Sequence, residues 1–241
     1  MLGPAGADGA VLVVGDANAN SVAPAVVAAA ESMGLRTLQW SRVGCPLLLG
    51  RAPVHYERCA EWQDEVIRLV ERVRPVAVVV ANQATAYTAS TDDPTVLAAP
   101  DGGRPPSAAS AVRDWGQALD RLLSDLDRRG IPTVVVGPIP DFGPGFPRTR
   151  FSLVVPDPAV PHLDRSAIER ERAAVVAVEQ GVVAGHAAAR WLDPLPRLCP
   201  ATCTPLRDGR WTYLERASLT NAASELLAGD LEQHLRELVR G

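Results

Sequence analysis

Residues 11–21 read VLVVGDANANS, a short apolar run that ends in a glycine, an aspartate and a polar turn. The apolar run Val11–Val14 is typical of a buried strand, and the pattern Ser21–Met33 predicts a helix. Asn20 or Ser21 is expected to cap this helix, because a side-chain oxygen there accepts hydrogen bonds from the first free N–H groups. A strand that leads directly into a helix predicts a parallel α/β sheet, in which ligands bind beyond the carboxyl ends of the strands.

The alternation of apolar and amphipathic segments continues along the chain. Strands are expected over Thr37–Trp40, Val76–Ala81, Thr133–Val136 and Arg190–Leu192, and helices over Glu61–Arg72, Ala111–Arg129, Ile168–Val183 and Thr220–Val239. This order predicts a three-layer α/β/α flavodoxin-like fold with a mostly parallel five-stranded sheet. The length of 241 residues fits a single domain over residues 1–241.

The composition excludes several classes of protein. The chain carries a net charge of −4, and all 24 basic residues are arginine. They form no basic stripe along the sequence, so a nucleic-acid partner is not indicated. Without lysine there is no Schiff-base or P-loop lysine chemistry, and the sequence has no glycine-rich nucleotide or zinc-hydrolase motif. No cofactor or metal is expected. No apolar run reaches the roughly 18–20 residues of a membrane helix, so we expect no membrane insertion.

Three polar or proline-rich excursions interrupt the α/β pattern. They cover residues 92–107, 138–161 and 194–210. Excursions of this kind usually form lids or binding loops. The acidic residues Asp92, Asp93 and Asp101 are expected to lie in a solvated loop.

Cysteine and histidine residues give no metal-site pattern. Four cysteines, spaced C-x13-C and C-x3-C, do not fit the paired knuckles of a zinc ribbon, and disulfides or free thiols both remain open. The histidines show no ligand spacing and are expected to be surface or packing residues without a partner; they are His55, His162, His186 and His234. Trp211 and Tyr213 fit packing better than a sugar-binding cleft.

Several blocks of the sequence resemble one family when they are taken in order. The turn Gly15–Ser21 resembles the Gly-Asp-Ser-His-Ala-Asn-Ser block of SGNH (GDSL-type) hydrolases. Within this family, the chain resembles the SGNH domains attached to bacterial membrane acyltransferases. Gly44–Pro46 matches the family's Gly-Cys-Pro, and Asn82 matches its third block. The Pro-rich exit Gly137–Asp141 and the final block Tyr213–Thr220 are also similar.

The resemblance assigns a role to each matching position. In the family a Ser attacks an acyl carbonyl, a His takes its proton, and an Asp three residues before the His orients it. In this chain Ala17 stands at the Ser position, Ser218 at the His position and Glu215 at the Asp position. The resemblance also implies an oxyanion hole formed by the Ala17 N–H, the Gly44 N–H and the Asn82 amide.

Three hypotheses follow for function. The first is a degenerate SGNH domain that binds a small-molecule or carbohydrate acyl ligand, or supports a membrane acyltransferase, without Ser-dependent turnover. The second is an active esterase or acyltransferase that is present here as a variant inactivated by Ser→Ala at position 17. A Ser codon at position 17 of the source gene would support this hypothesis, and an Ala codon would remove it. The third is a repurposed enzyme with acid–base chemistry at Asp16 and Glu215, where Arg216 binds an anionic substrate.

The resemblance also implies a cellular location. It implies disulfides between Cys45 and Cys59 and between Cys199 and Cys203, which form in an oxidising compartment. An extracytoplasmic site of action is therefore favoured, and a cytoplasmic one remains open.

Overall fold

The computed structural model describes residues 9–54, 56, 58–89, 96–98, 102–143, 146 and 162–240. His55, the acidic residues Asp92, Asp93 and Asp101, and most of the excursion over residues 138–161 lie outside the described residues.

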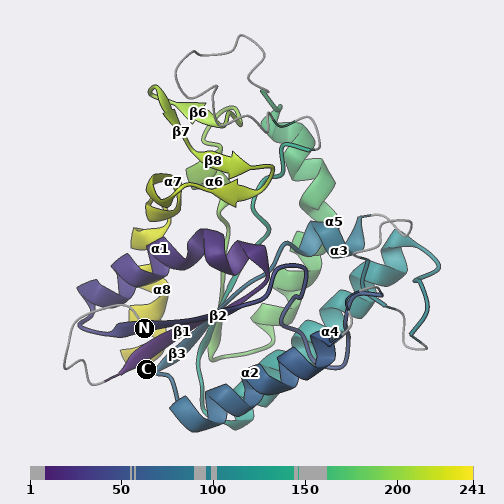
Figure 1. Cartoon of the computed structure of the whole chain (residues 1–241), viewed down its shortest axis with the longest axis vertical. Coiled ribbons are helices and arrows are strands. Elements are labelled where there is room, and N and C mark those ends of the chain that lie inside the picture. The colour runs from purple at the N-terminus through teal and green to yellow at the C-terminus, as the bar shows by residue number, and fades with distance from the viewer. Residues whose placement is uncertain are drawn as a thin grey trace.

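A parallel sheet of five strands forms the centre of the molecule (Figure 1). Its spatial order is β2-β1-β3-β4-β5, with every neighbouring pair parallel. The strands are β1 (Ala10–Gly15), β2 (Arg36–Ser41), β3 (Ala77–Ala81), β4 (Thr133–Val136) and β5 (Ala189–Leu192). The predicted α/β fold with a five-stranded parallel sheet is confirmed.

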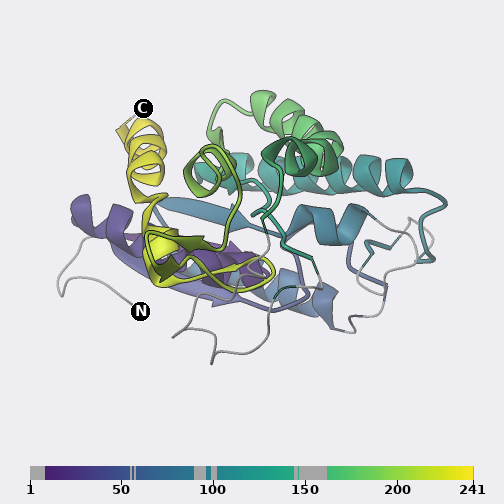
Figure 2. The ribbon, with the colours of Figure 1, turned by 90° about the horizontal axis from the view of Figure 1, so that it is seen from above.

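Helices cover both faces of the sheet. The helices are α1 (Ala17–Ser32), α2 (Cys59–Val73), α3 (Ala84–Thr88), α4 (Ala108–Arg128), α5 (Arg165–Ala184), α6 (Leu195–Leu198), α7 (Asn221–Glu225) and α8 (Ala228–Arg240). Helices α1 and α8 lie against one face, while α2 and α4 lie against the other (Figure 1). Helices α4 and α5 run beside each other (Figure 2). In the described part of the chain, no helix combines the length and the apolarity needed to cross a membrane.

The alternation of side chains along β1 separates two hydrophobic cores. Val11 and Val13 join the core under α1 and α8, whereas Leu12 and Val14 join the core under α2 and α4. All four are fully buried, as expected for a central strand covered on both faces.

Two small antiparallel hairpins follow the main sheet. They are β6 (Leu206–Arg207) with β7 (Arg210–Trp211), and β8 (Tyr213–Glu215) with β9 (Ser218–Leu219). They were not predicted from the sequence, because strands of two or three residues are too short to show an alternating pattern.

Three sequence expectations need correction. Helix α1 begins at Ala17, not at Ser21, because Asp16 caps it. The expected closing helix over Thr220–Val239 is broken into α7 and α8 by a turn that buries Leu227 completely. His186 has partners after all, since both of its ring nitrogens face carboxylates of α4.

Candidate functional site

The turns after β1, β2 and β3 meet at the carboxyl edge of the sheet. Gly15 ends β1 with a φ of +143°, and a Cβ on it would lie only 2.0 Å from the Ala81 carbonyl oxygen. The Gly15 carbonyl accepts a hydrogen bond from the Arg42 N–H, which follows β2. Glycine is therefore required here, because both the backbone angle and the contact with β3 exclude a side chain.

Asp16 holds two of these turns together. Its carboxylate accepts hydrogen bonds from the Asn18 N–H at 2.8 Å and from the Gln83 N–H, beyond β3, at 2.9 Å. The residue is 1% exposed, and burial raises the pKa of Asp16. Burial and the nearby Asp16 charge together raise the pKa of Tyr87. Asp16 is thus a helix cap and a link between loops.

Ala17 is the first residue of α1 and is half-buried. The Asn18 N–H donates to the Asp16 carboxylate and the Ala19 N–H to the Asp16 carbonyl. The Ala17 N–H precedes the first intrahelical bond, so the helix itself leaves it free to donate to a ligand. Helix N-termini also favour negative charge.

The loop after β2 brings Gly44 to the same edge. Gly44 has a φ of +75°, and a Cβ on it would lie 2.1 Å from the ring of Tyr56. The Tyr56 ring therefore lies directly against the Gly44 backbone. The disulfide Cys45–Cys59 closes the segment that carries Tyr56, so this arrangement is held covalently.

Asn82 fixes that loop from the end of β3. Its Oδ1 accepts from the Leu47 N–H at 3.0 Å, and its Nδ2 donates to the Leu47 carbonyl at 3.2 Å. A Cβ on Gly15 would lie 2.8 Å from Asn82 Oδ1, so the amide also lies beside the turn after β1. One Nδ2 hydrogen remains after the bond to Leu47. The turns that carry Ala17, Gly44 and Asn82 thus meet at one edge.

Gln83 is a buried residue of this edge that was not predicted from the sequence. Its Oε1 accepts from Asn18 Nδ2 at 2.5 Å, and its Nε2 donates to the Ile139 carbonyl at 3.0 Å. It connects α1 with the exit of β4. Its position directly after Asn82, at the end of a buried strand, was the available signal.

The β8–β9 hairpin lies beside the start of α1. The Leu219 N–H of β9 donates to Ser21 Oγ of α1 at 3.2 Å, which gives Ser21 an inter-element role in place of the expected cap. Glu215 pairs with Ser218 across the hairpin; Glu215 is exposed and Ser218 is half-buried. The segments around residues 17 and 218 therefore belong to neighbouring elements.

Arg216 fastens this hairpin to the exit of β4. Its Nε and Nη2 donate to the two carboxylate oxygens of Asp141 at 3.1 and 2.7 Å. The Phe142 N–H donates to the Arg216 carbonyl. The guanidinium is thus held by a neighbouring loop, as expected for a structural residue. Trp211 packs edge-on against Phe146 and Tyr213 against Phe142, which confirms the packing interpretation of both residues.

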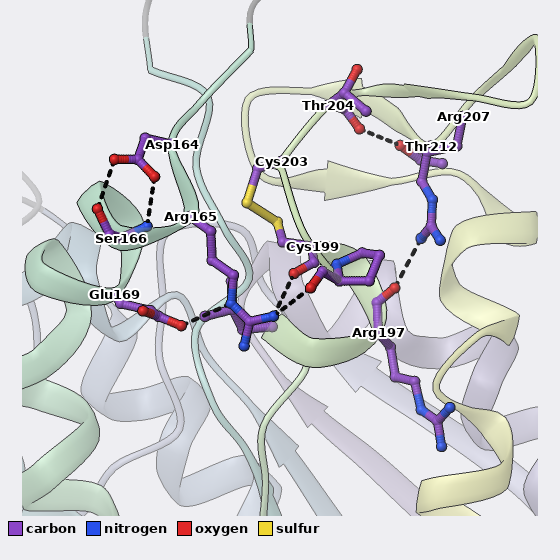
Figure 3. Close-up of a disulfide and its surroundings, with 12 residues drawn as sticks. Asp164, Arg165, Ser166, Glu169, Arg197, Cys199, Cys203, Thr204, Arg207 and Thr212 are labelled. Carbon is purple, nitrogen blue, oxygen red and sulfur yellow. Dashed lines mark hydrogen bonds and ion pairs between the residues drawn. A yellow bond between two sulfur atoms is a disulfide. The ribbon is translucent and has the colours of Figure 1, made fainter.

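The second disulfide, Cys199–Cys203, lies between α6 and the β6–β7 hairpin, near the start of α5 (Figure 3). Arg165 at the start of α5 donates to the carbonyls of Cys199 and Pro200 at 3.0 and 2.8 Å. Leu163 and Cys203 exchange two backbone hydrogen bonds. Both pairings that the family resemblance implied are present, and no cysteine is free.

The strand order and the loops at the carboxyl edge define an SGNH hydrolase-like α/β protein. The chain belongs to the family described as SGNH domain (fused to AT3 domains), whose profile matches residues 1–233. No curated protein matches it by sequence.

Two solved structures have the same fold. One is the periplasmic domain of a lipopolysaccharide acetyltransferase from Salmonella ser. Paratyphi A, with 13% identity, a TM-score of 0.62, and coverage of 94% of this chain and 83% of that chain. The other is the psychrotrophic esterase EstA from Pseudoalteromonas sp., with 13% identity, a TM-score of 0.50, and coverage of 97% and 100%. The chain is thus related in fold to acyltransferase and esterase structures.

Proposed function

We propose that this domain binds the acyl group of an O-acylated carbohydrate or another small molecule of the cell envelope, and that it supports a membrane acyltransferase without forming an acyl-enzyme. The observation that carries the proposal is the junction at the carboxyl edge, where the turns with Ala17, Gly44 and Asn82 are joined by hydrogen bonds. Amide donors gathered in this way suit the polarised oxygen of an ester carbonyl.

The side chains at two positions argue against turnover. The methyl group of Ala17 has no atom that can attack a carbonyl, and the hydroxyl of Ser218 does not accept a proton near neutral pH. The loss of nucleophile and base together typically removes about six orders of magnitude in rate. Binding through the amide donors does not need either group.

The proposed partner and location rest on the family and the disulfides. The family is described by its fusion to AT3 domains, and one structure of similar fold is a periplasmic acetyltransferase domain. Two disulfides suit an oxidising compartment. We therefore place the domain outside the cytoplasm, next to a membrane acyltransferase.

Acid–base catalysis by Asp16 and Glu215 gains no support from the geometry. Both carboxylate oxygens of Asp16 accept backbone hydrogen bonds, and the side chain is buried. Glu215 is exposed on a different element. The proposed function uses neither residue as an acid or a base.

Ester cleavage tests the proposal directly. The chain as written is expected to show no burst of p-nitrophenol from p-nitrophenyl acetate, whereas the double variant A17S/S218H restores a nucleophile and a base at the proposed positions and should give one. The single variant A17S is the matched control, because it adds the hydroxyl without a base and should remain near background.

Two results would contradict the proposal. A burst from the unaltered chain would mean that it holds another nucleophile. No burst from a folded A17S/S218H double variant would mean that positions 17 and 218 do not serve one pocket.

A further inference from the structure

Tyr56 reaches across to the turn that follows β2. The atoms nearest to a Cβ built on Gly44 would be Cε1, Cζ and Oη of Tyr56, at 2.1, 2.2 and 2.5 Å. The hydroxyl end of the ring therefore lies against the Gly44 backbone. Glycine is needed at this position because a side chain would fill the place of the ring, in addition to the φ of +75°.

The turn itself leaves the Gly44 N–H free for another partner. The Cys45 N–H donates to the Arg42 carbonyl at 3.0 Å, so residues 42–45 form a β-turn with Gly44 as the third residue. A positive φ at the third residue is typical of a type II turn. The bond that closes such a turn uses the N–H of the fourth residue. Among the described residues, the Gly44 N–H has no acceptor.

The Tyr56 hydroxyl is a second donor beside it. Tyr56 is 37% exposed, and no hydrogen bond joins its hydroxyl to any described residue. Its oxygen lies 2.5 Å from the Gly44 Cβ position, which by covalent geometry is about 2.5 Å from the Gly44 nitrogen. The two donor atoms are therefore at most about 5 Å apart. One acceptor at the usual distance of about 2.9 Å from each can bind both donors at once.

Covalent and polar links fix the ring in this place. The disulfide Cys45–Cys59 joins the turn to the segment that carries Tyr56. The Cys59 N–H donates to the Tyr56 carbonyl at 3.2 Å, and Arg42 Nη1 donates to the Arg58 carbonyl at 3.4 Å. A donor that is already held in position loses little conformational freedom when a ligand binds, which favours affinity.

We propose that the Tyr56 hydroxyl is a further hydrogen-bond donor of the acyl-binding edge, and that it makes this edge select an O-acylated carbohydrate over the same carbohydrate without the acyl group. The inference rests on the proposed function, because the Gly44 N–H is one of the amide donors assigned to the acyl carbonyl. A carbonyl oxygen has two lone pairs, so it can accept from the Gly44 N–H and from the phenol together. Loss of the acyl group removes this acceptor.

Calorimetric titration of the full chain with O-acetylated cellotetraose, and with cellotetraose itself, tests this role. The unaltered chain should bind the acetylated form more tightly. Tyr56→Phe keeps the ring against Gly44 and removes only the hydroxyl, so it should weaken binding of the acetylated form about fivefold. Its affinity for cellotetraose should stay the same, because that ligand lacks the carbonyl. A purely structural role of the hydroxyl would not produce this selective loss.

Tyr213→Phe is the matched control, because it removes a hydroxyl from a tyrosine that is 2% exposed and out of reach of a ligand. It should leave both affinities unchanged. Equal affinity of Tyr56→Phe and the unaltered chain for the acetylated form would overturn this inference and leave the proposed function in place. An equal loss for both ligands would also overturn it, since the hydroxyl would then not select the ester. If the unaltered chain shows no preference for the acetylated form, the proposed function fails together with this inference.

Discussion

Glu179 is a buried carboxyl group that should make the stability of this molecule depend on pH. It is 2% exposed, and burial raises the pKa of Glu179 to about 7, against the effect of the two indole N–H groups that it accepts. The unfolded carboxyl has its ordinary pKa of 4.5. Between pH 4.5 and about 7, Glu179 therefore stays protonated in the folded chain, whereas it is ionised in the unfolded chain.

A loss of stability between about pH 4.5 and 7 is the consequence. The contribution of Glu179 is fully present below the unfolded pKa and is lost as the pH rises through the folded pKa, by an amount on the order of 3 kcal/mol. Urea denaturation over this range should show the decline, and Glu179→Gln should flatten it. Glu169→Gln, at a half-exposed site on the same helix, is the control. The explanation fails if Glu179→Gln keeps the full decline.

At the scale of elements, His186 connects the end of α5 to α4. Its Nδ1 lies 2.5 Å from Asp127 and its Nε2 lies 3.1 Å from Asp120, and the imidazole is 10% exposed. Burial acts against the charged form, but the two carboxylates prevail and raise the pKa of His186. Its spacing in the sequence gave no indication of these partners, because both are contributed by another helix.

The contribution of His186 also has a defined pH range. It is fully present below about pH 6.5, the ordinary pKa, and is lost as the pH rises through the raised folded value. His186→Asn should destabilise the chain at mildly acidic pH and less at alkaline pH, where the imidazole has lost its charge. The expected loss at acidic pH is only about 1 kcal/mol, because Asp120 is exposed and its charge is screened by solvent. His162→Asn, at an exposed position, should change neither value. An equal effect of His186→Asn at both pH values would contradict the ion-pair explanation.

The two disulfides are expected to contribute unequally. Cys45–Cys59 spans 14 residues and Cys199–Cys203 spans 4. Loop-closure entropy assigns about 3 kcal/mol to the longer loop and about 2 kcal/mol to the shorter one. Denaturation of C45S/C59S and C199S/C203S should show this order. The opposite order would mean that the contacts around Cys199 outweigh chain entropy.

At the scale of the whole molecule, the apolar runs predicted the sheet well. Val11–Val14, Val76–Ala81 and Thr133–Val136 all lie in or overlap buried parallel strands, because a strand covered on both faces has to be apolar throughout. The hairpins were not predicted, since each strand is too short to show a period.

The candidate site was only partly predictable for a similar reason. The glycine and polar residues after each strand indicated which turns meet, because parallel strands end at one edge. The roles of Asp16 and Ser21 were not predictable, because their partners, Gln83 and Leu219, are far away in the sequence.

The most direct test of the acyl-binding edge is a titration of the isotope-labelled chain with an O-acetylated oligosaccharide, followed by NMR. We predict saturable shifts of the Ala17 and Gly44 amide signals, while the acetyl groups of the oligosaccharide stay intact. Release of acetate during the titration, or a saturated complex in which both amide signals are unmoved, would contradict the account.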